Sequence, residues 1–387
     1  MGKRELLLIV AFVIVGAVVY QATAPPPGPD DRSFSLGRLV DHLKREIGGN
    51  KFLEETTQAA THRLDDEIAE IRVVGYLADE VRVTGETRSD VETTLRVSSR
   101  AYTDEEAKKF ANETVLKSDR AANSLVFSVR YPTGRHTGRQ RAALTLKVPA
   151  RMRIRVEARP SRLTITNVAG VETTNSGGET TITKVAGRVA MTHRGGKAIV
   201  EDCAALKFNG RGAEVTVTRV RGDASITLDG GGRFRGVELA GPLDVETRNS
   251  EVTLDGLSAT RGPIRVNAQN GEVTLNDLKA DTRVDGRNAE LHVTMSGAAP
   301  VALYTENGDL TLTPPAAGYT LDALAVEGRI TPEAVLERFG LEHTVDADSK
   351  EARASGAVNG GGATITVRAT RADVIINERT EPAKPKN

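Results

Sequence analysis

Residue types that could support catalysis or bind a metal are few in this chain, and they are widely spaced. Histidine occurs six times in 387 residues, and no two histidines stand at the i, i+4 spacing of a helical zinc motif. Cys203 is the single cysteine, which excludes an internal disulfide, and its acidic neighbours Glu201 and Asp202 disfavour a thiolate. We therefore predict no metal site, no cofactor and no catalytic residue, and we expect Cys203 to be a small buried hydrophobe. The histidines are His42, His62, His136, His193, His292 and His343.

Segments rich in glycine and serine also lack the context that chemistry would require. Gly230-Gly-Gly232 is followed by Arg-Phe-Arg rather than by Lys-Ser/Thr and a helix, so it is not a phosphate-binding loop. Ser176-Gly-Gly178 and Ser355-Gly356 lack the strand, sharp turn and helix that present a serine nucleophile. No Gly-Gly-x-Gly-x-Asp run recurs, which excludes a calcium-binding β-roll.

One enzymatic alternative stays open. Some parallel β-helices cleave polysaccharides with charged residues on an outer face, and Asp244, Glu246, Glu251 and Glu272 could pair in that way. Nothing distinguishes these carboxylates from solvated outward residues, and aromatic residues make up only 4% of the chain, so sugar-stacking rings are scarce. We predict that the protein is not an enzyme.

The elements that would position these residues are short β-strands. The chain contains 37 glycines, no tryptophan and 39% hydrophobic residues, many of them small or β-branched, which favours thin stacked layers over a thick globule. Its 52 basic and 52 acidic residues cancel, so no field attracts nucleic acid.

Two interleaved series of short β-branched runs extend over residues 151–313. Most runs of one series lie roughly 16 to 21 residues apart, and a run of the other series falls between them. Two strands per period, repeated about nine times, predict a parallel β-solenoid, in which each turn covers the apolar face of the next. An antiparallel sandwich is the rival fold, but it would not need so regular a period. We expect bends at Asn209-Gly210, Asp229-Gly230, Asp255-Gly256, Asn270-Gly271, Asp285-Gly286 and Asn307-Gly308.

Flanking segments are expected to cover the open ends of the solenoid. Residues 67–150 read as a small α/β lead-in, with alternating strands and a helix that begins at the capping box Thr103-Asp-Glu-Glu106. Its segment Thr133–Arg141 carries three arginines and a histidine, and either holds an anionic group or is a solvated hairpin loop. Residues 314–378 are a predicted C-terminal cap with a helix from Thr331 to Phe339 and two last strands. Residues 379–387 form a polar, proline-containing tail that we expect to be disordered.

The N-terminal segment predicts a membrane anchor. Lys3 and Arg4 precede an uncharged run, and residues 5–24 approach the roughly 20 residues that span a bilayer. We expect residues 1–24 to be an uncleaved signal anchor with the bulk of the chain outside the cytoplasm, although Ala22-Thr23-Ala24 also has the form of a cleavage site. A proline-rich spacer over 25–32 and short helices over 33–66 complete this region.

Several segments resemble one known family. The opening strand Asp79-Glu-Val-Arg-Val-Thr-Gly85, the strand Leu144-Thr-Leu-Lys-Val-Pro149 and the closing Gly-Gly-Gly-Ala-Thr-Ile-Thr-Val367 are similar to segments of the bacterial adhesin-like β-strand-repeat family, domain of unknown function 4097. The resemblance covers about residues 70–378. It implies a β-solenoid on a bacterial protein that is often membrane-anchored, and it carries no catalytic residues.

These observations predict a membrane-anchored, extracytoplasmic scaffold whose solenoid face binds envelope polysaccharide or protein. The alternative is a regulatory or assembly partner of a membrane complex that acts through the anchor and the N-terminal helices; a polysaccharide-active enzyme is the third hypothesis. The predicted fold class is all-β: a parallel β-solenoid with a small α/β lead-in and an N-terminal transmembrane helix. The sequence does not identify the ligand or the oligomeric state.

Overall fold

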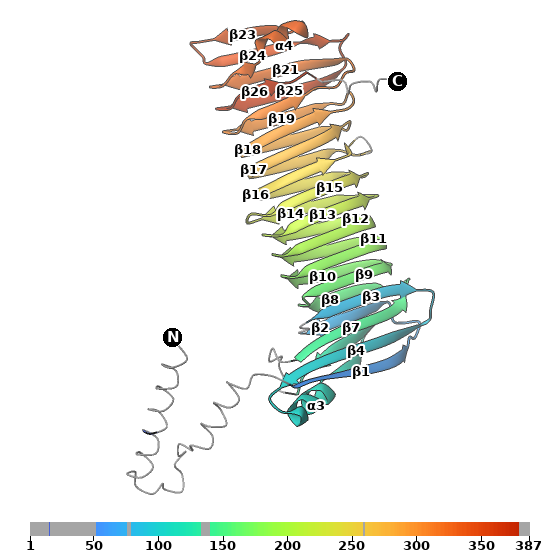
Figure 1. Ribbon diagram of the computed structural model, residues 1–387. Helices are drawn as coiled ribbons and strands as arrows, with labels where there is room; N and C mark the ends of the chain where they lie inside the picture. Colours follow the sequence, from blue (N-terminus) through green and yellow to red (C-terminus); the bar gives the residue numbers. More distant parts are fainter. Residues whose placement is uncertain (1–14, 16–51, 76–78, 133–139, 258–259, 379–387) are drawn as a thin grey trace, which may run out of the picture.

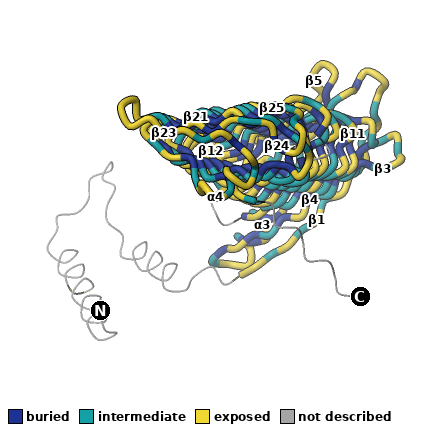
Figure 2. The backbone as a smooth tube through the Cα atoms, turned by 90° about the horizontal axis from the view of Figure 1, so that it is seen from above, coloured by how far each residue is buried: buried dark blue, intermediate teal, exposed yellow. Residues whose placement is uncertain are grey.

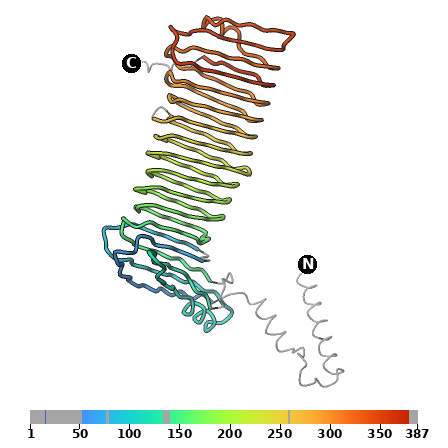
Figure 3. Tube along the Cα trace, turned by 180° about the vertical axis from the view of Figure 1, so that it is seen from behind, coloured from blue at the N-terminus to red at the C-terminus, as the bar shows by residue number. Residues whose placement is uncertain are grey.

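Layers of short strands, stacked one on another, make up most of the molecule. The computed structural model describes residues 15, 52–75, 79–132, 140–257 and 260–378. In these ranges each layer contributes one strand to each of two opposite faces, and the layers form one elongated stack (Figure 1). The layers follow one another at a regular spacing when the stack is seen from behind (Figure 3).

The alternation of apolar and polar residues explains why one layer stacks on the next. In the run Val252-Thr253-Leu254, the two apolar side chains are buried and Thr253 lies outward. Val252 is in register with Phe234 of the preceding layer and with Val273 of the following one. A single layer would leave these side chains in water, so each layer depends on its neighbours to cover it.

Face 1 is one of the two faces, and in the described ranges it contains thirteen parallel strands. The antiparallel strand β5 (Val115–Ala121) extends it at the N-terminal end, and β24 (Glu351–Val358) and β23 (Glu342–Asp346) extend it at the other. Its parallel strands are, in order along the stack, β6 (Ser124–Arg130), β2 (Glu70–Gly75), β8 (Arg153–Ala158), β10 (Gly170–Ser176), the second halves of β11 (Glu179–Arg194) and β12 (Lys197–Arg211), β14 (Ala224–Asp229), the first halves of β16 (Leu243–Asp255), β17 (Ile264–Leu278) and β18 (Thr282–Met295), β19 (Val301–Glu306), β25 (Ala363–Thr370) and β21 (Tyr319–Val326).

Face 2 lies opposite and is built in the same way. The antiparallel strands β4 (Asp90–Ala101) and β1 (Phe52–Arg63) extend its N-terminal end. Its parallel strands are, in order, β7 (Gln140–Pro149), β3 (Glu80–Glu86), β9 (Arg162–Val168), the first halves of β11 and β12, β13 (Glu214–Val220), β15 (Arg233–Leu239), the second halves of β16, β17 and β18, β20 (Leu310–Thr313), β26 (Val374–Ile376) and β22 (Ile330–Thr331).

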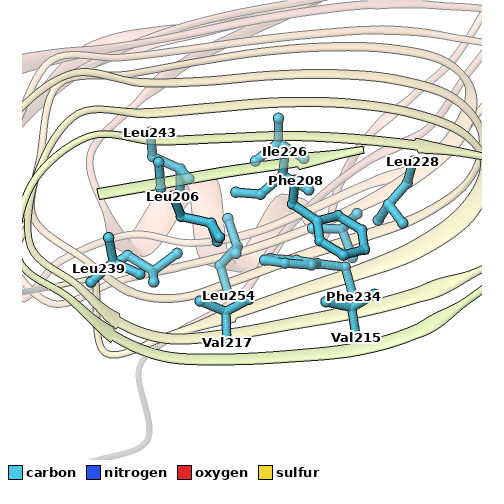
Figure 4. Packing of buried hydrophobic residues seen from close by; sticks show 14 of the residues in the cluster. Leu206, Phe208, Val215, Val217, Ile226, Leu228, Phe234, Leu239, Leu243 and Leu254 are labelled. Carbon is cyan, nitrogen blue, oxygen red and sulfur yellow. The ribbon is translucent and has the colours of Figure 1, made fainter. Parts of the chain in front are cut away.

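The core is the thin space between the two faces. Dark blue buried positions alternate with exposed ones along the layers in Figure 2. Phe208 of face 1 and Phe234 of face 2 point toward one another in Figure 4, and both are 0% exposed. Leucines, valines, isoleucines and alanines make up most of the rest, in keeping with the low aromatic content.

The corner from face 1 to face 2 is built in two ways along the stack. In N-terminal layers glycines with positive φ form it; a Cβ on Gly196 (φ 69°) would lie 2.2 Å from the carbonyl oxygen of Gly178. In later layers one asparagine with φ between 50° and 57° takes their place. Each of these amides after the first donates to the side-chain oxygen of the preceding one at 3.0 Å. We call these residues the asparagine column: Asn249, Asn270, Asn288 and Asn307.

Replacing Asn288 by valine is expected to destabilise the fold by about 2–4 kcal/mol, because a β-branched residue resists positive φ and two amide hydrogen bonds are lost. Asn288→Gly keeps the backbone conformation and should cost less. Asn209→Val, at an exposed position inside β12, is the matched control and should change little. Chemical denaturation of the three variants checks this, and equal effects of Asn288→Val and Asn209→Val would contradict it.

Both ends of the stack depart from chain order. The layer formed by β2 and β3 lies between the layer of β6 and β7 and the layer of β8 and β9 (Figure 1). The last two strands in the chain also leave chain order. On face 1, β25 lies between β19 and β21, and on face 2, β26 lies between β20 and β22. The helix α3 (Asp104–Glu113) packs on β1 and β4 at one end, and α4 (Glu333–Arg338) packs beside β22 and β23 at the other.

The prediction of an N-terminal transmembrane helix is wrong on the structure as described. Among these residues no helix is long and apolar enough to cross a membrane. The two helices α3 and α4 have 10 and 6 residues, whereas a bilayer requires roughly 20. Residues 1–14 and 16–51, and with them nearly all of the predicted anchor, spacer and first short helix, lie outside the described residues. The fold class that the structure supports is an all-β parallel solenoid.

A second correction concerns the last part of the predicted short helices. Residues 52–63, which fall within the predicted short helices, form the strand β1. It pairs antiparallel with β4 along its whole length, from Phe52 opposite Ala101 to Arg63 opposite Asp90. The local helix propensity of this segment is weak, and pairing of twelve consecutive residues with β4 at the edge of face 2 stabilises a strand instead. The helix at Thr103 is confirmed, because the Thr103 side chain accepts a hydrogen bond from the Glu106 amide at 3.1 Å.

The repeat prediction is confirmed over 151–313, with nine layers, but the stack continues into both flanking segments. Two of the predicted bends are wrong. Gly210 lies inside β12 and Gly286 inside β18, and neither has positive φ. They are glycines for reasons of space: a Cβ on Gly210 would lie 2.4 Å from the Phe208 ring, and one on Gly286 3.2 Å from the Leu291 side chain.

Candidate binding face

The cysteine and the described histidines do not come together into one site. Cys203 is fully buried, as expected, and burial raises the pKa of its thiol to about 11, so it is not a nucleophile at neutral pH. His193 points into the core, whereas His292 lies on the outside of face 2, with Glu272 at 3.8 Å and Glu290 at 3.9 Å. In the described part of the chain, no group of three or more His, Cys, Asp or Glu residues could hold a metal ion. His42 and His136 lie outside the described residues.

The four carboxylates considered for polysaccharide cleavage are divided between the two faces. Asp244 and Glu246 lie outward on face 1, and Glu251 and Glu272 lie on face 2, where they are register neighbours. Arg233 binds Glu251 with an N–O distance of 2.7 Å. The predicted arginine loop cannot be placed, because residues 133–139 lie outside the described residues.

Face 2 presents hydroxyls and an alternating row of charges. Thr164, Thr181, Thr216 and Thr253 belong to one outward column along the stack. Beside it, residues of opposite sign follow one another from layer to layer: Arg162, Glu179, Lys197, Glu214, Arg233 and Glu251. Within this row Arg162 is ion-paired with Glu179 and Arg233 with Glu251. The row continues with the carboxylates Glu272 and Glu290, so the alternation of charge ends at Glu251.

Face 1 carries three hollows along the stack, whereas face 2 carries one over β1, β3, β4 and β7, and another lies at the turns that follow its strands β13 and β15. One hollow lies over β2, β8, β10 and β11, a second over β12, β14, β16 and β17, and a third over β17, β18, β19 and β25. The first two share Arg188, and the last two meet at β17, where Arg265 lines one and Asn267 the other. Together they follow most of the length of face 1, the first two at the beginnings of its strands and the third at their ends, and we call these three hollows the face 1 channel.

The third hollow is about 460 Å³ in volume and is lined mostly by polar side chains. Tyr304 is half-buried there, and the guanidinium carbon of Arg283 lies 4.6 Å from the centre of its ring. Arg283 also binds the Asp285 carboxylate with two hydrogen bonds of 2.8 and 2.9 Å. The ring, the guanidinium and the carboxylate therefore hold one another in place.

Further ion pairs order the rest of this hollow. Glu306 binds both Arg287, at 3.3 Å, and Arg371, at 2.5 Å. Arg368 binds the Asp322 carboxylate and also donates to the Asp322 carbonyl oxygen at 2.8 Å. Tyr304 follows one of the predicted β-branched runs, but the sequence analysis did not single it out. The alternation of that strand, in which every second side chain points outward, could have identified it as an outward aromatic residue.

Fold and surface together define a two-faced parallel β-solenoid with a channelled outer face. The chain belongs to the family described as Toastrack, DUF4097, whose model matches residues 70–377, so the predicted resemblance is confirmed. No curated protein matches the chain. One similar solved structure is that of a "putative cell adhesion protein" from Clostridium sporogenes, at 7% identity over 84% of this chain and 100% of that chain, with a TM-score of 0.19. That likeness is too low to carry an argument about function.

Proposed function

We propose that the protein is a non-enzymatic scaffold that binds an extended polymer along face 1. The observation that supports this proposal is the face 1 channel, three hollows in succession on one side of a continuous stack. A polymer that lies along the stack meets the outward side chains of one layer after another, roughly every 4.8 Å, so many weak contacts add up.

The distribution of charged groups favours binding over chemistry. The carboxylates around Tyr304 are paired with arginines, and the four carboxylates considered for cleavage are divided between two faces. An extracytoplasmic location stays a prediction, as does the alternative of a partner that acts through N-terminal residues.

Blocking face 1 is expected to weaken polymer binding by at least tenfold. The blocking variant combines Ala190→Arg and Ser225→Arg, which line the first two hollows. The matched control combines Thr181→Arg and Thr216→Arg, outward positions of face 2. Binding of the full chain to mannan, β-glucan, hyaluronate and polygalacturonate is measured by affinity electrophoresis. The proposal fails if the wild-type chain binds none of these polymers, or if the face 2 control loses as much affinity as the face 1 variant.

A further inference from the structure

We propose that the hollow around Tyr304 is a subsite for a short segment of neutral glycan. This inference rests on the proposed function, because it assigns a ligand class to one part of the face 1 channel. It depends on the geometry, the charge and the donor and acceptor groups of that hollow.

The hollow lies between two outward columns that run along the stack. In register on successive layers, the first column contains Asn267, Asp285, Tyr304 and Arg368. The second lies two residues further along each strand and contains Gln269, Arg287, Glu306 and Thr370. Four layers at the spacing of parallel strands give a floor of roughly 14 Å along the stack. That shape suits a chain that lies lengthwise, rather than a compact ligand.

Charge selects against an ionic ligand. The hollow is lined by two arginines, Arg287 and Arg368, and by two carboxylates, Asp285 and Glu306. The charges of the lining itself cancel, and together with the ion-pair partners Arg283, Arg371 and Asp322 the cluster carries a single net positive charge, because Glu306 is shared by two arginines. One shared charge does not balance the repeated carboxylates of a polyuronate. A neutral polymer does not need such compensation.

The side chains present match polyhydroxylated ligands. Amides, carboxylates and guanidinium groups are planar and hold two hydrogen-bonding atoms side by side, as neighbouring hydroxyls of a sugar do. Asn267 and Gln269 supply amides, and the guanidinium of Arg287, which is exposed, retains donors beyond its pair with Glu306. Tyr304 adds an apolar ring with a polar hydroxyl, which suits the mixed surface of a pyranose.

Pre-organisation makes such weak contacts effective. Arg283 is held by two hydrogen bonds to Asp285 while it stacks on Tyr304, and Glu306 is held between Arg287 and Arg371. Because these side chains are already ordered, a ligand does not have to immobilise them, and less binding free energy is lost.

The test measures tetrasaccharide binding to the full chain by calorimetry. Mannotetraose, laminaritetraose and chitotetraose are the neutral probes, and tetragalacturonate is the acidic one. We expect at least one neutral probe to bind, and Tyr304→Ala to weaken it tenfold or more. The double variant Asn267→Ala and Gln269→Ala, which breaks no ion pair, should weaken it as well. Thr311→Ala on face 2 is the control and should bind like the wild type.

The inference is overturned if no neutral tetrasaccharide binds, if tetragalacturonate binds more tightly than all of them, or if Tyr304→Ala binds like Thr311→Ala. Its failure can be told from failure of the proposed function. Suppose that the wild-type chain binds a polymer and that the variant Ala190→Arg with Ser225→Arg has a lower affinity for it. Face 1 is then a polymer-binding face, and only the assignment of the Tyr304 subsite is wrong.

Discussion

Val367→Asp is expected to unfold the C-terminal end of the stack while the central layers stay folded. Val367 belongs to β25 and is 0% exposed. In register it lies between Leu303 of β19 and Ala323 of β21, so it is covered on both sides by other layers. An aspartate there has no cationic partner on the inner side of the strand, because its register neighbours are apolar.

The expected loss exceeds about 5 kcal/mol. Burial of a valine side chain stabilises a fold by roughly 1.5–3 kcal/mol, and an uncompensated buried charge costs about 3–5 kcal/mol more. Displacement of β25 also separates β19 from β21, because no described pairing joins these two strands directly. Layers of a solenoid interact only with their neighbours, so the damage should stop within a few layers.

Hydrogen exchange read by mass spectrometry distinguishes this outcome from global unfolding. Amides of residues 319–377 should lose protection, whereas those of β12 to β16 should keep it. Thr364→Asp, an exposed position on the same strand, is the matched control and should cost below about 1 kcal/mol. Full protection of residues 319–377 in Val367→Asp would show that β25 does not hold the end together.

The central layers could be predicted because their alternation of apolar and polar residues buries the apolar side chains in only one register. Runs such as Val252-Thr253-Leu254 recur at one period, and any shift by one residue would turn their apolar side chains to water. The layers at the two ends could not be placed in this way. The inward residues of β21 and of β25 are both small or aliphatic, apart from Tyr319, so either strand could stack on β19. The sequence predicted two last strands after the C-terminal helix but did not place them in the stack, and the structure shows that β25 stacks on β19.

The proposed binding face was harder to predict than the fold for a similar reason. Outward positions of both faces carry the same residue types, and the sequence does not say where along each face the hollows lie. The ion pairs around Tyr304 join residues up to 65 positions apart, such as Arg371 and Glu306, because β25 returns to lie beside β19. A site that depends on the returning strand cannot be read from a local repeat.

Acid is expected to destabilise the protein through His193. This side chain is 0% exposed, and neither of its ring nitrogens has a hydrogen-bond partner. Its register neighbours are Asn175 on one side and Gly210 on the other, and neither can balance a positive charge. Burial therefore lowers the pKa of His193 below its usual 6.5. Burial also lowers the pKa of the less buried His62.

The direction of this pH effect follows from the linkage between proton binding and folding. Above about pH 6.5 His193 is neutral in both the folded and the unfolded chain, and pH has no effect through it. Below that pH the unfolded chain binds a proton that the folded chain refuses, so the free energy of unfolding decreases as pH falls. The decrease approaches about 1.4 kcal/mol per pH unit for one histidine and stops below the pKa of His193 in the folded chain.

Urea denaturation of the wild type, His193→Leu and His62→Ala between pH 8 and pH 5 tests this. His193→Leu removes the titrating group and two unpaired buried nitrogens, so it should be at least as stable as the wild type at pH 8 and should lose much of the pH dependence. His62→Ala should remove a smaller part, because its side chain is only partly buried. If His193→Leu keeps the slope of the wild type between pH 6 and pH 5, the acid sensitivity comes from other groups. If the pH dependence of the free energy of unfolding disappears in His193→Leu, the acid sensitivity comes from a histidine buried between the two faces and not from groups on the outer faces.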